Sequence, residues 1–481
     1  MTSASGHERS RKRAPYVFSQ IQELVWCVLT PPTVRAAGRC VPAKYVLRRG
    51  IRDSLITACG AVMTPRPTSP RAFLFLCTIL AGVDGVWAGA DWPQFLGPNR
   101  NGTCPAAQIA LTWPKEGPPQ LWQRKVGEGF SGPVVSGGKL ILFHRVADKE
   151  TVEALDAGKG GSIWKSDYPT HYRDDFGFDE GPRATPAVAD GRVFTYGADG
   201  MLSCWALDTG AKQWNVDTPK EFHSGKGFFG RAGSPLVEGN EVIVDIGGRP
   251  GAGIVAFEAA TGKVRWKATD EEASYSSPVA ANFGGRRRVL ALTRGTLTAL
   301  DPANGRVIFQ YPWRPPISNS VTAAVPLVLD DLIFLSASYG TGAALLRYQD
   351  QGPEKIWAAD EVLSNHYATS VERGGFLYGF DGRQEQGCVL RCVELKTGKV
   401  RWSEDGLKAG TVTLAGDHLL VLTERGELIL APAAPAGFKP LARAQVLPFV
   451  VRAYPALADG RLYARSKDQL VCLDLRPTAK P

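Results

Sequence analysis

Five segments of this chain share one short pattern, in which a glycine is followed four residues later by a large aromatic side chain. Four of them align without gaps, and the fifth joins if Cys204 takes the first position; they span residues 154–164, 204–214, 256–266, 299–309 and 392–402. With Trp357 included, the successive aromatics are spaced by 50, 52, 43, 48 and 45 residues. A period of this length is typical of one structural unit repeated along a chain.

Each unit has the pattern of several short β-strands. In residues 184–214, runs of alternating or β-branched residues are separated by Asp-Gly and Thr-Gly turns. Glycine supplies the positive φ that tight hairpin turns require. No sustained apolar period near 3.6 residues follows the first ninety residues, so helix should be scarce. Four strands in about 40–50 residues is the sequence signature of a β-propeller blade.

The number of blades depends on the weaker copies of the pattern. Trp122 begins the series, Trp357 follows a one-residue insertion, and Leu441 takes the place of an aromatic. The last unit, residues 453–475, contains only three predicted strands, and the missing strand is available near Trp122. We therefore predict an all-β protein, an eight-bladed β-propeller of four-stranded antiparallel blades over residues 121–476 that is closed by the N-terminal strand. Eight blades leave no sheet edge unpaired, and seven blades are the alternative.

The repeated aromatic has two interpretations. It could stack on a cofactor, or it could pack against the neighbouring blade as a large hydrophobic side chain. A cofactor needs one such residue, whereas this chain repeats it in nearly every blade. We therefore expect structural docking between blades by Trp122, Trp164, Trp214, Trp266, Phe309, Trp357 and Trp402.

The first ninety residues lack the repeat, and their second part has the order of a secretory signal peptide. Residues 63–90 combine a short basic stretch, a 12-residue apolar run and an Ala-x-Ala motif. The apolar run is too short to span a bilayer. We predict cleavage after Ala90, an arm at 91–120, a tail at 477–481, and a periplasmic or secreted protein that does not span the membrane.

Residues 1–62 lie upstream of a segment that should itself be N-terminal. They are rich in arginine and contain no turn-and-strand repeat, so our hypothesis is a non-native or disordered extension, with translation beginning at Met63. The chain has a formal net charge of +9, of which residues 1–62 carry +7 and residues 63–90 carry +1. The mature chain is nearly neutral, which argues against a nucleic-acid partner.

The cysteines and acidic residues suggest no metal site. In an oxidising compartment, an odd number of cysteines leaves at least one thiol free. Three of the five that follow Ala90 occupy equivalent positions of the repeat, so we interpret them as core thiols. No haem-attachment motif, zinc spacing or EF-hand spacing occurs. The five cysteines, whose disulfide state the sequence leaves open, are Cys104, Cys204, Cys388, Cys392 and Cys472.

The connectors between blades are the least regular parts of the repeat. They lead from the outer strand of one blade to the inner strand of the next, at the mouth of the central channel, and functional residues concentrate on such loops. Three arginines and several neutral donors around one opening suit a carboxylate or another anion. The ligand-binding candidates, one or two from each connector, are Arg183, Arg231, Tyr275, Asn319, Asn365, His366, Arg452 and Tyr454.

Two further interpretations of these connectors remain open. Each arginine could pair with a nearby acid, such as Asp179, Glu180 or Glu272, and only fix the conformation of its loop. His366 is the candidate general base, although the sequence assigns it no partner. No catalytic residue is otherwise assigned.

The chain resembles the pyrroloquinoline-quinone (PQQ) repeat propellers. Their docking motif, Ala-x-Asp-x-x-Thr-Gly-x-x-x-Trp, is matched most closely by residues 256–266, 299–309 and 392–402, and the resemblance runs from about residue 91 to 476. The stretches 91–100 and 335–344 are similar to those of a subgroup of secreted bacterial members.

The resemblance implies one of two functions. The family contains alcohol and glucose dehydrogenases that use PQQ with Ca²⁺, and a non-catalytic propeller of outer-membrane assembly. This chain lacks the adjacent cysteines of the alcohol dehydrogenases, and their calcium-binding set has no match that we can place. We therefore expect a monomeric binding or scaffolding module for an envelope protein or a small-molecule ligand. The alternative is a PQQ-dependent dehydrogenase that oxidises an alcohol or a sugar.

Overall fold

The computed structural model describes residues 91–105, 107–318 and 320–477. Contacts within the chain divide it into units 1–81 and 82–481, and all described residues belong to the second unit. The predicted signal peptide, the extension before it and Asn319 lie outside the described residues.

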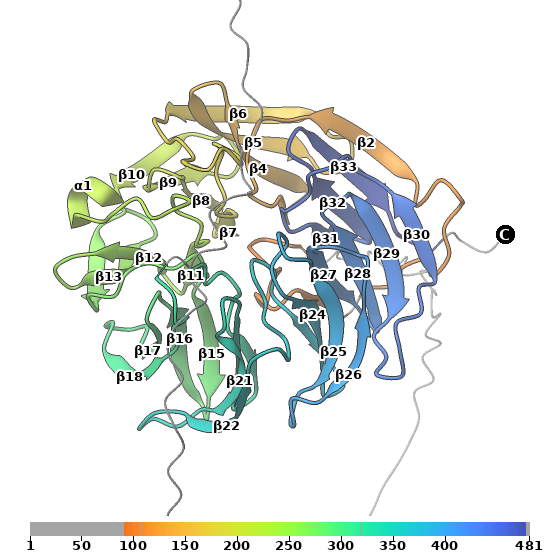
Figure 1. The fold of residues 1–481 in the computed structure, drawn as a ribbon. Helices are drawn as coiled ribbons and strands as arrows, with labels where there is room; N and C mark the ends of the chain where they lie inside the picture. The colour runs from red at the N-terminus through yellow and green to blue at the C-terminus, as the bar shows by residue number, and fades with distance from the viewer. Residues whose placement is uncertain (1–90, 106, 319, 478–481) are drawn as a thin grey trace, which may run out of the picture. The chain divides into compact units, whose positions relative to one another are not determined.

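Antiparallel four-stranded sheets follow one another along the chain, as Figure 1 shows. The first strands of neighbouring blades contact each other, which places these strands around the central channel. Blades 1 to 4 consist of β3 (Val134–Ser136), β4 (Lys139–Val146), β5 (Lys149–Asp156) and β6 (Ser162–Pro169); β7 (Ala187–Ala189), β8 (Arg192–Tyr196), β9 (Met201–Ala206) and β10 (Lys212–Asp217); β11 (Leu236–Glu238), β12 (Glu241–Gly248), β13 (Ala252–Glu258) and β14 (Val264–Ala268); and β15 (Val279–Phe283), β16 (Arg286–Leu292), β17 (Thr296–Leu300) and β18 (Val307–Pro312).

The second half of the chain continues the same topology. The one helix among the described residues, α1 (Thr218–Phe222), lies in the connector between blades 2 and 3. Blades 5 to 8 consist of β19 (Leu327–Leu329), β20 (Leu332–Ala337), β21 (Gly342–Arg347) and β22 (Glu354–Ala359); β23 (Val371–Arg373), β24 (Phe376–Asp381), β25 (Val389–Glu394) and β26 (Val400–Glu404); β27 (Gly410–Ala415), β28 (His418–Thr423), β29 (Glu427–Pro432) and β30 (Ala442–Gln445), joined by β1 (Thr103–Cys104); and β31 (Ala456–Ala458), β32 (Arg461–Arg465), β33 (Gln469–Asp474) and β2 (Gln120–Lys125).

The last blade is completed by a strand from the other end of the described chain. β2 pairs antiparallel with β33, and Trp122 lies opposite Cys472. The prediction of an eight-bladed, all-β propeller closed by the N-terminal strand is therefore confirmed, and the seven-bladed alternative is wrong.

The repeated tryptophans lie where neighbouring blades meet. The indole N–H of Trp122 donates to Ala157 O at 3.0 Å, that of Trp164 donates to Leu207 O at 2.9 Å, and that of Trp214 donates to Ala259 O at 3.0 Å. Each acceptor belongs to the next blade, at its turn between the third and fourth strands. The same contact is made by Trp266 to Pro302, by Trp357 to Leu395 and by Trp402 to Ala434.

Phe309 and Leu441 differ from this pattern. Phe309 has no N–H to donate, and its ring packs instead near Tyr348, with ring centroids 5.7 Å apart. Leu441 is exposed, and Ala442 is the residue paired with Leu430, at the register position that an aromatic occupies in the other blades. The expectation that Leu441 replaces the aromatic was therefore wrong by one residue, because the blade 7 strand begins later.

The glycine of the repeat is explained by the tryptophan that covers it. Gly160 has φ of 72°, and a Cβ there would lie 2.7 Å from the ring of Trp122. Gly210 and Gly262 have the same relation to Trp164 and Trp214. Both the left-handed backbone and the close ring therefore require glycine at this position.

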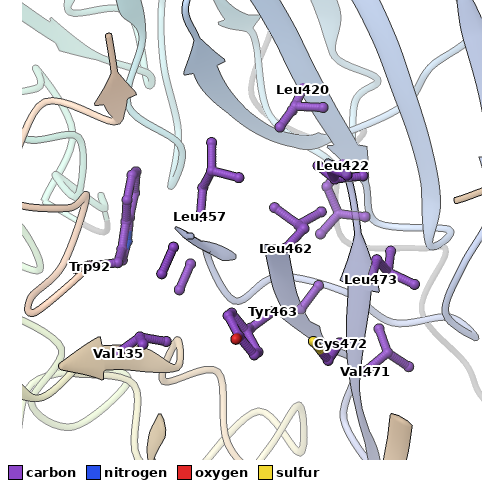
Figure 2. Close-up of a cluster of buried hydrophobic side chains, with 14 of the residues drawn as sticks. Trp92, Val135, Leu420, Leu422, Leu457, Leu462, Tyr463, Val471, Cys472 and Leu473 are labelled. Atoms are coloured by element: carbon purple, nitrogen blue, oxygen red, sulfur yellow. The ribbon is translucent and has the colours of Figure 1, made fainter. Parts of the chain in front are cut away.

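The N-terminal arm was predicted only as a segment before the propeller, and the structure places it across the channel. The backbone of Trp92 pairs with Val135 of β3, and the Arg100 guanidinium donates to Ser234 O and Pro235 O beside β11. β1 then pairs parallel with β27. Figure 2 shows Trp92 beside Val135 and Leu457 in the buried cluster that joins the arm to blades 1, 7 and 8. The arm thus runs from blade 1 to blade 7 and fills one end of the channel.

The five cysteines of the described chain are all buried, and none forms a disulfide with another. Cys204, Cys392 and Cys472 lie opposite Trp214, Trp402 and Trp122, so their positions are equivalent in the register as well. No described helix has the length and apolar character needed to cross a membrane.

Candidate ligand pocket at the channel mouth

A pocket of about 180 Å³ opens at the end of the channel to which the blade connectors lead. Seven of its lining residues carry a phenyl or phenol ring, and these rings come from the arm and from connectors between several pairs of blades. The rings are those of Phe95, Phe130, Phe178, Phe229, Tyr275, Tyr367 and Tyr454.

The N-terminal arm contributes one wall of the pocket. Asp91 accepts hydrogen bonds from Ser136 and Gly137, in the turn at the end of β3 opposite to the connectors. From this end the arm carries Phe95 into the channel, where its ring meets Tyr454 edge to face, with centroids 5.2 Å apart. The arm therefore forms part of the pocket wall within the channel.

Of the two arginines that line the pocket, Arg452 makes fewer hydrogen bonds to the protein. Its Nε donates to Glu424 Oε1 at 2.7 Å. The guanidinium carbon lies 5.5 Å from the ring centre of Phe130 and 5.4 Å from that of Phe178, which is the geometry of a cation–π contact. No described residue accepts a hydrogen bond from Nη1 or Nη2, and the side chain lines the pocket. These two groups are therefore available to a ligand.

The guanidinium of Arg183 has more contacts with the protein than that of Arg452. Its guanidinium donates to Asp179 O at 3.0 Å and lies 3.6 Å from the Asp174 carboxylate, and its side chain is only 10% exposed. The structure thus gives Arg183 and Arg452 one acidic partner each, but not the acids named from the sequence. Glu180 lies against Arg145 and Arg173, and Glu272 lies against Arg294.

His366 lines the pocket with both ring nitrogens occupied. Nε2 is 3.1 Å from the Tyr339 hydroxyl, and Nδ1 contacts Gln384 Oε1. Burial lowers the pKa of His366, which favours the neutral ring. Because neither nitrogen is open to the cavity, the geometry does not favour His366 as a general base.

Tyr275 and Tyr454 also line the pocket, but their hydroxyl groups bond to the backbone. Tyr275 accepts from Phe228 N at 2.8 Å, and Tyr454 accepts from Thr369 N. The hydroxyl group of Tyr454 also donates to Thr369 O, so this residue offers the pocket its ring. The Tyr275 hydroxyl only accepts, and no described residue takes its proton.

Two other sequence candidates lie elsewhere, and Asn319 is outside the described residues. Asn365 is buried, donates to Phe380 O at 2.8 Å and accepts from the Ser370 hydroxyl. Arg231 does not line this pocket and lies in a neighbouring one. The candidates that the structure brings together are Arg183, Tyr275, His366, Arg452 and Tyr454.

Sequence reasoning missed the aromatic wall of the pocket. Phe176 and Phe178 lie in one connector, and Phe228 and Phe229 lie in the next. The rings of Phe176 and Phe229 are 5.0 Å apart, so the two connectors meet through these side chains. Apolar residues in otherwise polar loops were the signal that could have identified them.

The described residues offer no obvious site for a metal cofactor. No group of three or more His, Cys, Asp or Glu side chains among them is arranged to hold a metal ion. We assign no catalytic step to a PQQ–Ca²⁺ pair.

Known structures with the same fold are numerous but distant in sequence. BamB from Moraxella catarrhalis is 16% identical, with a TM-score of 0.56, over 76% of this chain and 99% of that one. Quinohemoprotein alcohol dehydrogenase from Comamonas testosteroni is 16% identical, with a TM-score of 0.57, over 82% of each chain. The computationally designed Ika8 protein is 13% identical, with a TM-score of 0.52, over 74% of this chain and 99% of that one. These likenesses establish the fold.

No curated protein sequence matches the chain. The model of a PQQ-repeat family, described as outer membrane protein assembly factor BamB, matches residues 148–404. This match spans more than half of the 481 residues and six of the interblade aromatics. The chain therefore belongs to the BamB-like family of PQQ-repeat β-propellers.

Proposed function

We propose that this protein is a periplasmic or secreted binding module whose channel-mouth pocket binds a small ligand with a flat apolar body and a carboxylate. The proposal rests on the hydrogen bonds that the Arg452 side chain makes and on those it leaves unmade. Its Nε is fixed by Glu424, whereas Nη1 and Nη2 lack a described acceptor and face the cavity. A guanidinium held in this way can bind a carboxylate through two parallel hydrogen bonds.

The walls of the pocket support an apolar ligand body. Phe130, Phe178 and Phe229 surround the two guanidiniums, and Phe95 forms the floor. Flat rings offer large contact areas and favour offset or edge-to-face packing with another ring. Because Glu424 and Asp174 already balance the two arginines, charge alone would attract an anion weakly, and the apolar contacts would supply much of the affinity.

The proposal favours binding over catalysis because the one histidine of the pocket has no free ring nitrogen. The rim also carries exposed rings, of which Phe176 is 54% and Phe178 46% exposed. Exposed apolar groups beside a ligand pocket are typical of contact surfaces for a protein partner. An envelope protein that docks here would meet the pocket and its ligand together.

Benzoate should bind the wild-type protein measurably in isothermal titration calorimetry, whereas acetate and benzyl alcohol should bind much more weakly. Acetate lacks the ring, and benzyl alcohol lacks the carboxylate. The double variant Arg452→Met/Glu424→Gln should weaken benzoate binding by about tenfold or more, since a hydrogen bond to a charged group contributes about 1.5–3 kcal/mol. Changing both partners avoids leaving Glu424 as a buried, unpaired charge.

The matched control is Arg443→Met/Glu427→Gln, which removes another Arg–Glu pair, 2.8 Å apart, between β29 and β30 and outside the pocket. It should leave benzoate binding unchanged. Equal binding of acetate and benzoate, or equal losses in the two double variants, would contradict the proposal.

A quinoprotein dehydrogenase is the second candidate function, supported by the fold shared with the Comamonas enzyme. Purified protein mixed with PQQ and CaCl₂ should give no dye reduction with a panel of alcohols and sugars. Denatured protein serves as the baseline. Turnover that requires both added components would replace the binding proposal with the enzymatic one.

A further inference from the structure

A second, polar pocket of about 340 Å³ lies beside the first one, between blades 3 and 4. It is formed by the connector after α1, the turn between β12 and β13, the connector between β14 and β15, and the turn between β16 and β17. Tyr275 lines both pockets and separates them. The two cavities have different chemistry, because the second contains no phenylalanine.

The second pocket is strongly basic. Its lining includes Lys226, Arg231, Arg249 and Arg294, together with His223, and a single carboxylate, that of Glu272. Glu272 lies 3.4 Å from Arg294. Lys226 lies 2.8 Å from Asp175, so two positive charges, those of Arg231 and Arg249, remain without an acidic partner even with the histidine neutral. Each arginine of the first pocket, by contrast, has its own acid.

Arg231 is the central feature of this pocket. Its side chain donates to Ile246 O at 2.9 Å and to Ser224 Oγ at 2.6 Å, and the residue is only 6% exposed. No described carboxylate lies within 4.0 Å of it. Burying a charge without an opposite charge beside it is costly, and an anion bound in this cavity would supply that charge.

Asp245 is a buried acid near Arg231 that forms no ion pair with it. Burial raises the pKa of Asp245 to about 8, against the opposing effects of a hydrogen bond from Ser274 and the charge of Arg231. Burial thus favours the neutral form of the Asp245 carboxyl group. The positive charge of Arg231 remains available on the side that faces the pocket.

The other cations approach from separate loops around a space that glycines leave open. Gly225, Gly227, Gly230 and Gly247 line the same cavity and put no side chain into it. Arg249 is exposed and has no described carboxylate within 4.0 Å. Arginines that converge from several directions match the oxygens of a tetrahedral dianion.

We propose that this pocket is an oxyanion site, which binds a phosphate or sulfate group either free or as an ester. The ligand's oxygens meet Arg231 at the base, with Arg249, Arg294 and Lys226 around the opening. The site is separate from the channel-mouth pocket, so the loss of one site leaves the other to be tested independently.

The test uses the full protein and the double variant Lys226→Gln/Arg249→Gln, in which both altered side chains are exposed and the buried Arg231 is kept. Inorganic phosphate, sulfate and glucose 6-phosphate are titrated at constant ionic strength, with chloride as the reference salt. Phosphate or its ester should bind the wild type and raise its melting temperature above that in chloride. The double variant should bind about tenfold or more weakly.

The control is Lys263→Gln/Arg306→Gln, an equal change in charge at two exposed turns on the opposite side of the blades. It should bind like the wild type. Tighter binding of glucose 6-phosphate than of phosphate identifies an ester as the ligand, and the reverse identifies the free ion. A response no larger than that to chloride, or equal losses in both double variants, would overturn the proposal.

Discussion

Replacing Trp92 by alanine should lower the free energy of unfolding by about 4 kcal/mol, the usual cost of removing a buried tryptophan. Trp92 is 2% exposed and packs in the cluster shown in Figure 2, where the arm meets blades 1, 7 and 8. Its ring also covers Gly97, at which a Cβ would lie 2.8 Å from the ring. Urea unfolding followed by circular dichroism measures the loss without depending on tryptophan fluorescence.

Trp113→Ala is the matched control, because Trp113 belongs to the same arm but is only partly buried against that cluster. It should cost less than half as much as Trp92→Ala. If the two losses are equal, or if Trp92→Ala costs below about 1 kcal/mol, then the arm does not fill the channel as described here.

The second large effect is expected at the glycine beneath Trp122. Gly160→Ala should destabilise the protein by about 3 kcal/mol, because a left-handed backbone costs a non-glycine residue about 1–2 kcal/mol and forced overpacking adds about 1–3 kcal/mol. Gly160 has φ of 72°, and the added Cβ would lie 2.7 Å from the ring of Trp122. Thermal and urea unfolding of the variant test this directly.

The neighbouring residue provides the control for Gly160. Gly161 lies in the same turn, its φ is not in the left-handed region, and a Cβ there would meet nothing within 4 Å. Gly161→Ala should therefore change the stability by less than about 0.5 kcal/mol. Similar losses at both positions would show that the turn tolerates no side chain, and that the ring of Trp122 is not the cause.

The architecture could be predicted from the sequence because it depends on local geometry that recurs. In five blades a glycine with positive φ lies under the aromatic ring of the preceding blade, so the spacing from glycine to aromatic marks these blade boundaries directly. The incomplete last unit and the isolated Trp122 also predicted how the ring of blades closes. Leu441 was misplaced by one residue because no aromatic fixes the register in that blade.

The arm and the pocket could not be predicted in the same way. The arm occurs once and contacts strands that are far away in the chain, such as Arg100 against Ser234 and Pro235. Such contacts leave no repeated pattern in the sequence from which they could be predicted. The signal peptide and Asn319 lie outside the described residues and remain sequence predictions.

The arginines of the connectors show most clearly what could not be predicted from the sequence. Arg183 and Arg231 have equivalent places in the repeat, but Arg183 lies against Asp174 in the aromatic pocket, and Arg231 is held by Ile246 O and Ser224 in the basic one. Asn365 likewise uses its amide within its own blade. The conformation of each connector decides which cavity its side chains enter, and tertiary contacts determine that conformation.

The most direct test of the central claim is a crystal structure of the protein with benzoate. We expect a carboxylate that accepts hydrogen bonds from Nη1 and Nη2 of Arg452, with the ring of benzoate among Phe130, Phe178 and Phe229. Benzoate bound only beside Arg231, or a channel-mouth pocket that stays without ligand at saturating benzoate, would contradict it.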